Sequence, residues 1–273
     1  MLVARGFVPL ILHRHWQNNS PAETDVEIGA QAYRIDGAER TGRLVIVCDH
    51  ASNAVPPEIG GGSLGLPEAE MSRHIAHDVG AAGVARALGR LLDSPVIEAT
   101  FSRLVIDPNR GEDDPTLVMR LYDGTIIPGN RHIDEAEIAR RRDRYYRPYH
   151  GALAGLLAAR KGAVPVSIHS FTPRLSGRDP RPWHVGVLHG DDLRLAAPML
   201  ARLAAEPDIT PGDNEPYAGF FEGDTMYRHA IRAGRPYLLL EIRNDLIADA
   251  AGQEAWASRL APMIAEVVAG ALA

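Results

Sequence analysis

The most constraining feature of this 273-residue sequence is the uninterrupted apolar run Leu44–Cys48, which stops abruptly at Asp49 and His50. Continuous β-branched runs of this kind are typical of strands buried on both faces of a parallel sheet. Similar runs predict a second strand at residues 164–168 and a third at residues 237–242. Because helical patterns lie between these runs, the sequence predicts an α/β fold whose mostly parallel sheet is covered on both sides.

Other segments extend the same pattern. Short apolar runs predict further strands at residues 96–99, 104–106 and 184–188. Apolar residues at helical spacing predict longer helices at residues 67–91, 134–161 and 254–273. Gly80 and Gly83 leave open whether the first segment is one helix or two, and Pro148 is expected to kink the second.

Length and composition favour one soluble domain. The chain is long enough for a single α/β core over residues 41–273, with residues 1–40 as an extension or arm. A net charge of −6 and the lack of a basic stripe argue against a nucleic-acid partner. No apolar run reaches the roughly 18 to 20 residues of a membrane-spanning helix. The single cysteine, Cys48, cannot form an internal disulfide, which fits a cytoplasmic protein, and it is expected to be a buried strand residue.

Ionisable side chains stand at the ends of the three main predicted strands, namely His50, His169 and Glu241. Parallel strands bring their carboxyl ends to one edge, where ligands of open α/β sheets bind. Two histidines and a carboxylate with one open position are typical of a hydrolytic zinc site, which also needs a carboxylate as general base. Glu241 is the candidate for that base; the alternative is an ion pair with Arg243 or Arg103.

The third metal ligand is expected from His74, His77 and Asp78, which form a His-x-x-His-Asp motif in a predicted helix. Asp78 is the favoured ligand, with the two histidines on the helix surface or beside the site, although either could replace it. Zn²⁺ suits histidine and carboxylate donors best, and Mn²⁺, Fe²⁺ or Co²⁺ are alternatives.

Arginines in and around a long predicted loop, residues 107–130, are candidates for substrate binding, because a guanidinium can grip a carboxylate with two hydrogen bonds. These are Arg103 and the pair Asn109-Arg110, with Arg243 as a further choice. The alternative for Arg110 is an ion pair with the acidic residues 112–114. In a second expected site loop, Tyr217 is either a hydrogen-bond donor to the substrate or part of a plain turn.

Several short motifs follow one another over about residues 44–247. They are Asp49-His50-Ala51-Ser52-Asn53, His77-Asp78, Tyr149-His150, Ile168-His169-Ser170-Phe171, Asn214-x-Pro216-Tyr217-x-Gly219 and Leu240-Glu241-Ile242-Arg243. Together, in this order and at this spacing, they resemble the N-formylglutamate amidohydrolase family.

The resemblance implies a three-layer αβα fold similar to zinc-dependent exopeptidases, and hydrolysis of N-formylglutamate to formate and glutamate in histidine breakdown. It implies metal binding by His50, Asp78 and His169, with Glu241 as the base. The Asn109-Arg110 pair looks like the one that zinc carboxypeptidases use for a substrate carboxylate. His150 matches the family pattern as a group that supports the site or transfers protons, and Ser52 is a further substrate-binding candidate.

One departure concerns the first motif, where better-known members have Pro-His-Ser-Gly and this chain has Asp49-His50-Ala51-Ser52. We expect this difference to affect the substrate more than the fold. The alternatives are a zinc-dependent peptidase or deacylase for another small acyl-amino acid or peptide, and a non-catalytic binding protein with the same fold. A homo-oligomer also remains open.

Overall fold

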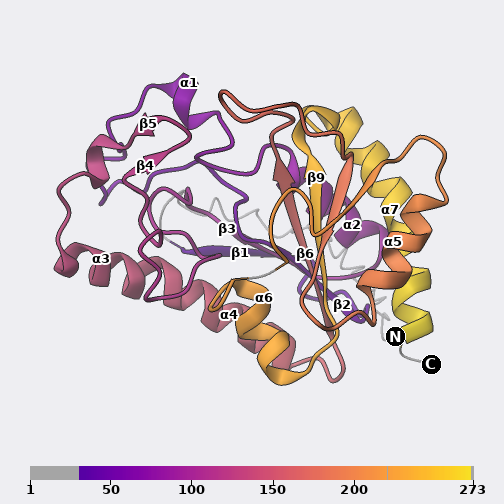
Figure 1. Cartoon of the computed structure of the whole chain (residues 1–273). Coiled ribbons are helices and arrows are strands. Elements are labelled where there is room, and N and C mark those ends of the chain that lie inside the picture. Colours follow the sequence, from indigo (N-terminus) through magenta and orange to yellow (C-terminus); the bar gives the residue numbers. More distant parts are fainter. Residues whose placement is uncertain (1–30, 220, 272–273) are drawn as a thin grey trace, which may run out of the picture.

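The computed structural model of the chain describes residues 31–219 and 221–271 (Figure 1). Most of the expected N-terminal arm, residues 1–30, therefore lies outside the described residues. The strand Tyr33–Asp36, which falls within the expected arm, pairs with the strand Val96–Ala99 at an edge of the central sheet. The sheet thus begins before residue 41.

In the described residues, seven strands form the central sheet in the order β1-β3-β2-β6-β9-β7-β8. Their bounds are β1 Tyr33–Asp36, β2 Leu44–Cys48, β3 Val96–Ala99, β6 Val164–Phe171, β7 Val185–Leu188, β8 Pro211–Asp213 and β9 Leu238–Arg243. The pairs β3-β2, β2-β6, β6-β9 and β7-β8 are parallel, and β1-β3 and β7-β9 are antiparallel. The predicted, mostly parallel sheet is confirmed.

Helices cover both faces of this sheet (Figure 1). One face carries α2 Ala81–Leu91, α5 Ala196–Ala204 and α7 Ala250–Ala271, and the other carries α4 Arg147–Ala158 and α6 Thr225–His229. The remaining short helices are α1 Glu68–Met71, α3 Glu135–Arg141 and the 3₁₀ turns Pro128–Asn130, Ile231–Ala233 and Asn244–Leu246. The result is the expected three-layer αβα fold. Within the described residues, no helix combines the length and apolar character needed to cross a membrane.

Side chains of β2 alternate between two apolar cores. Ile46 and Cys48 pack with the helices α2, α5 and α7, whereas Val45 and Val47 pack with α4 on the opposite face. All four side chains are fully buried, because a central parallel strand has a helical layer on each side. Cys48 is a buried free cysteine, as predicted.

The predicted helix at residues 67–91 breaks into α1 and α2, with turns at residues 72–80 between them. Gly80 has a φ of 80°, and a Cβ there would lie 2.1 Å from the carbonyl oxygen of Ile247. Only glycine tolerates that combination of backbone angle and contact. His74, His77 and Asp78 therefore lie in a turn, and the prediction that they share a helix is wrong. Asp78 is anchored there by its N–H, which donates to the His50 carbonyl at 2.9 Å.

The predicted strand at residues 104–106 is also wrong. Its side chains are buried, but the backbone forms turns in which Val105 N donates to Ser102 O at 2.9 Å. The Ser102 hydroxyl donates to Ala76 O and accepts from Leu104 N. Local serine hydrogen bonds thus satisfy backbone groups that a strand would pair with a neighbour.

The helix predicted at residues 134–161 is interrupted by a π-helical segment, Arg142–Tyr146, between α3 and α4. Pro148 lies just beyond that segment. Because proline has no N–H and its ring collides with the carbonyl four residues earlier, a widened turn relieves the conflict. The predicted loop at residues 107–130 holds a small hairpin, β4 Leu121–Tyr122 and β5 Thr125–Ile126.

Candidate active site

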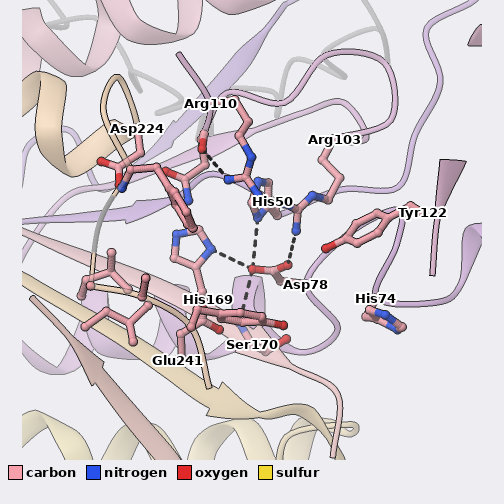
Figure 2. Close-up of a pocket in the computed structure, with 17 residues that line it drawn as sticks. His50, His74, Asp78, Arg103, Arg110, Tyr122, His169, Ser170, Asp224 and Glu241 are labelled. Atoms are coloured by element: carbon pink, nitrogen blue, oxygen red, sulfur yellow. Dashed lines mark hydrogen bonds and ion pairs between the residues drawn. The ribbon is translucent and has the colours of Figure 1, made fainter. Parts of the chain in front are cut away.

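The carboxyl edge of three adjacent strands carries the side chains that the sequence singled out. His50 follows β2, and His169 and Glu241 lie near the carboxyl ends of β6 and β9. These strands are parallel neighbours in the sheet, so the predicted convergence is found. All three side chains are buried at the bottom of one pocket (Figure 2).

The Asp78 carboxylate is the centre of this cluster (Figure 2). Its Oδ2 atom lies 3.2 Å from His50 Nδ1 and 2.8 Å from His169 Nδ1, and it accepts from Ser170 N at 3.3 Å. His50, Asp78 and His169 each offer a ligand atom within 4.8 Å of the others. Two imidazole nitrogens and a carboxylate oxygen are the donor set of a zinc site, so these residues fit such an ion.

The far nitrogen of each histidine ring faces a second carboxylate. His50 Nε2 lies 2.7 Å from Asp107 Oδ1, and His169 Nε2 lies 3.3 Å from Asp49 Oδ2. Histidines that bind metals commonly carry a carboxylate on the other ring nitrogen, which fixes the tautomer and the ring orientation. Arg103 holds Asp107 in turn, with Nε and Nη2 donating to Oδ2 at 3.0 and 2.7 Å.

The electrostatic balance of the cluster also suits a cation. Burial raises the pKa of Asp78, but the adjacent His50 and His169 outweigh burial and lower this pKa below its usual range. Burial lowers the pKa of His169, but Asp49 and Asp78 outweigh it and raise that pKa well above its usual value. The carboxylates thus favour positive charge between them, which a divalent ion supplies.

Glu241 differs from the other carboxylates of the cluster. Its Oε2 atom is buried and has no hydrogen-bond partner in the part of the chain that the structure describes. Burial raises the pKa of this carboxyl above its usual value, and the nearby His169 only partly offsets the rise. Glu241 does not pair with Arg243 or Arg103, which were the alternatives. Arg243 pairs instead with Asp245 at 2.8 Å, and Arg103 pairs with Asp107.

Arg110 lines the pocket above this cluster. Its Nη1 donates to Asn109 O at 2.8 Å, its Nε donates to Thr116 Oγ1 at 3.2 Å, and its guanidinium lies 5.4 Å from the centre of the Phe221 ring. Among the described residues it forms no ion pair with the acidic residues 112–114, which were the alternative. Its positive charge therefore faces the pocket without a carboxylate partner from that loop.

Asn109, Arg103 and Tyr217 also line the pocket. Asn109 Oδ1 accepts from Thr225 N at 3.1 Å, so its amide nitrogen remains available as a donor. The Arg103 guanidinium is already bonded to Asp107 and lies 3.5 Å from Asp78 Oδ1. The Tyr217 hydroxyl accepts from Arg181 Nη1 at 3.3 Å, which leaves its own proton free to donate.

Four sequence-predicted residues do not line the pocket, namely Ser52, His77, Arg243 and His150. The Ser52 hydroxyl accepts from Ala54 N at 3.1 Å in a local turn. His150 is buried, and its Nε2 lies 3.0 Å from Pro108 O while its Nδ1 lies 2.9 Å from His229 Nε2. His74 does line the pocket, but its Nε2 lies 3.5 Å from Asp123 and it stays outside the His50-Asp78-His169 group.

Sequence reasoning gave no role to several residues of the site. Asp107 is the main one, and a local signal existed, because it stands four residues after Arg103 and directly before Pro108. Tyr122 and Phe221 form aromatic walls of the pocket. No sequence pattern indicates Tyr122, because the hairpin that presents it lies in the segment that the sequence predicts to be a loop.

A three-layer αβα fold with buried histidines and carboxylates at the carboxyl edge of its sheet is typical of hydrolases. The model of the N-formylglutamate amidohydrolase family matches residues 42–248. The chain therefore belongs to that family, and it is an amide-bond hydrolase.

The chain is also similar to solved structures. The gene product Atu2144 of Agrobacterium tumefaciens is 36% identical, with a TM-score of 0.83 over 90% of this chain and 98% of that chain. N-formylglutamate amidohydrolase from Ralstonia eutropha JMP134 is 22% identical, with a TM-score of 0.62 over 88% of this chain and 99% of that chain. At that identity, the second likeness supports the fold alone. The comparison with curated proteins gives no match.

Proposed function

We propose that the protein is a metal-dependent amidohydrolase that cleaves a small N-acyl amino acid, with N-formyl-L-glutamate as the first candidate substrate. The observation that carries the proposal is the convergence of His50 Nδ1 and His169 Nδ1 on Asp78 Oδ2, with a carboxylate behind each ring. Membership of the N-formylglutamate amidohydrolase family supports the choice of substrate.

In this proposal His50, Asp78 and His169 hold the metal ion. A bound Zn²⁺ lowers the pKa of a water molecule and polarises an amide carbonyl, which makes an amide open to attack near neutral pH. The same donors accept Mn²⁺, Fe²⁺ or Co²⁺. Burial of the three side chains keeps competing water away from the ligand atoms.

Glu241 acts as the general base. Its unpartnered Oε2 atom accepts a proton from the attacking water, and the resulting acid returns that proton to the nitrogen of the leaving amino acid. A carboxyl group whose pKa lies above its usual range is suited to both steps, because proton exchange is most efficient when the pKa is close to the working pH.

Arg110 and Asn109 bind the substrate carboxylate. The guanidinium supplies the positive charge, and the Asn109 amide nitrogen is free because Thr225 N occupies the amide oxygen. Charge-assisted hydrogen bonds of this kind give both affinity and orientation. Tyr217 lines the same pocket and donates its hydroxyl proton to the bound substrate.

The test combines metal content with turnover. The protein is purified without a metal-binding tag, its metals are measured by elemental mass spectrometry, and formate release from N-formyl-L-glutamate is assayed. His169→Ala is compared with His132→Ala, which removes an exposed histidine outside the pocket. We expect about one zinc per chain and turnover in the wild type and in His132→Ala, and loss of both in His169→Ala.

Other outcomes separate the parts of the proposal. Zinc without formate release would retain the metal site and exclude this substrate, so a panel of other N-acyl amino acids would follow. Absence of both metal and turnover after zinc is added back would overturn the proposal.

A further inference from the structure

We propose that Asp49 is a positioning residue for the metal ligand His169, and that Tyr149 and Thr225 hold Asp49 in place. This inference rests on the proposed metal site. Position 49 is one of three positions at which the chain departs from the Pro-His-Ser-Gly motif, and its aspartate lies behind His169 rather than in the substrate pocket. At this position the departure therefore bears on the metal ligand.

The contact between Asp49 and His169 joins two buried atoms that have no other partner. Asp49 Oδ2 and His169 Nε2 are 3.3 Å apart, and neither makes a hydrogen bond with any described residue. A buried polar atom without a partner is costly, so each is the natural partner of the other. Because a carboxylate only accepts, Asp49 Oδ2 favours a proton on Nε2 of His169, and this is the tautomer that leaves the lone pair of Nδ1 for a metal ion.

Two hydroxyl groups fix the orientation of Asp49. Its Oδ1 atom accepts from Tyr149 Oη at 2.7 Å and from Thr225 Oγ1 at 2.9 Å. Asp49, Tyr149 and Thr225 are all fully buried, so these bonds are shielded from water. With Oδ1 occupied by both donors, Oδ2 is left to face His169.

Thr225 has a second contact that links the two halves of the site. Its hydroxyl holds Asp49, while its backbone N–H donates to Asn109 Oδ1 at 3.1 Å. Thr225, at the start of α6, therefore orients two residues. These are Asp49, which supports the metal ligand, and Asn109, which is proposed to donate to the substrate carboxylate. A substitution that removes the hydroxyl of residue 225 removes the hydrogen bond to Asp49. It retains the backbone N–H that donates to Asn109.

The decisive readout is metal affinity, measured on metal-free protein by competition with a chromophoric zinc chelator. Asp49→Asn keeps the size of the side chain and removes its charge. We expect the dissociation constant for Zn²⁺ to rise about 10- to 100-fold, the usual effect of losing a carboxylate behind a ligating histidine. Thr225→Val removes one hydroxyl from a buried site, and we expect a smaller rise in the same direction.

Two controls distinguish positioning from damage to the fold. Thr225→Ser restores the hydroxyl, so it should recover the wild-type zinc affinity. Asn109→Ala should raise KM at saturating zinc without changing zinc affinity. Thr225→Val should weaken zinc binding and leave KM at saturating zinc unchanged. Circular dichroism and thermal melting establish that each variant is folded. If Asp49→Asn does not fold, Thr225→Val and Thr225→Ser decide the question.

The outcomes also separate this inference from the proposed function. Wild-type protein that binds zinc and turns over substrate, beside folded Asp49→Asn and Thr225→Val variants with unchanged zinc affinity, would overturn the inference alone. Wild-type protein that binds no zinc would overturn both. If Thr225→Val and Thr225→Ser raise the dissociation constant for Zn²⁺ equally, the hydroxyl of Thr225 does not hold Asp49 in place.

Discussion

His169 and Glu241 are direct partners in the register of the parallel strands β6 and β9. Partners in adjacent strands are separated by the strand spacing of about 4.8 Å and point to the same face of the sheet. The proposed metal ligand and the proposed base are therefore placed by a backbone ladder in the centre of the sheet. Such a ladder positions reacting groups more rigidly than loops do.

This relationship predicts a selective effect of Glu241→Gln. The substitution keeps the shape of the side chain and removes its ability to accept a proton, while the metal ligands stay in place. We expect kcat to fall about 10²- to 10⁴-fold, the usual contribution of general acid–base catalysis, with zinc content unchanged. Steady-state kinetics and elemental analysis measure the two quantities. The exposed Glu254→Gln is the control, and a kcat within a few-fold of wild type in Glu241→Gln would exclude Glu241 as the base.

Removal of metal should destabilise the fold. The buried cluster contains Asp49, Asp78, Asp107 and Glu241, and an ion that binds only the folded state offsets their mutual repulsion. Free zinc at about 100 times its dissociation constant contributes about 2.7 kcal/mol to the free energy of unfolding. Thermal melting after chelation, and again after zinc is restored, measures this effect. His50→Ala should melt at the same temperature with and without zinc, and an equal zinc-dependent rise in that variant would argue against His50 as a ligand.

The two candidate arginines should behave differently. Arg110→Ala removes a guanidinium that lines the pocket, and we expect KM to rise about 10- to 100-fold because a charged hydrogen bond contributes about 1.5–3 kcal/mol. Arg243→Ala should leave KM close to that of the wild type, because its guanidinium bonds Asp245 and Trp183 O outside the pocket. Initial rates over a range of substrate concentrations test both. The reverse ranking would move the carboxylate site to Arg243.

The sequence predicted the sheet and its reactive edge because those features depend on short-range patterns. Apolar runs located β2, β6 and β9, and parallel topology then required that His50, His169 and Glu241 meet. The elements it missed depend on contacts between distant segments. Asp78 reaches the site through a turn that is held by the His50 carbonyl, which no helical periodicity reveals.

The supporting residues were harder to predict for the same reason. Asp49 and Thr225 are 176 positions apart, and their contact arises only when α6 packs beside the carboxyl end of β2. Residues 104–106 have the composition of a strand, yet local serine hydrogen bonds fold them into turns. Composition thus predicted their burial and not their backbone conformation.

A buried pair of histidines should make the protein sensitive to acid. Burial lowers the pKa of His150 to about 3, with a further lowering by His229, and burial lowers the pKa of His229 to about 4. Both rings are therefore neutral in the folded protein, where His150 Nδ1 faces His229 Nε2 and His150 Nε2 faces Pro108 O. In the unfolded chain each ring takes up a proton near pH 6.5.

The sign of the effect follows from this difference. Below about pH 6.5 the unfolded state binds more protons than the folded state, so the free energy of unfolding falls as the pH drops toward 4. His229→Gln keeps an N–H donor for His150 and removes one titrating group. Its free energy of unfolding should fall less steeply than that of the wild type between pH 6 and 5, by up to about 1.4 kcal/mol per pH unit. Urea denaturation at several pH values measures both slopes, and parallel slopes would show that His229 is not titrated on unfolding.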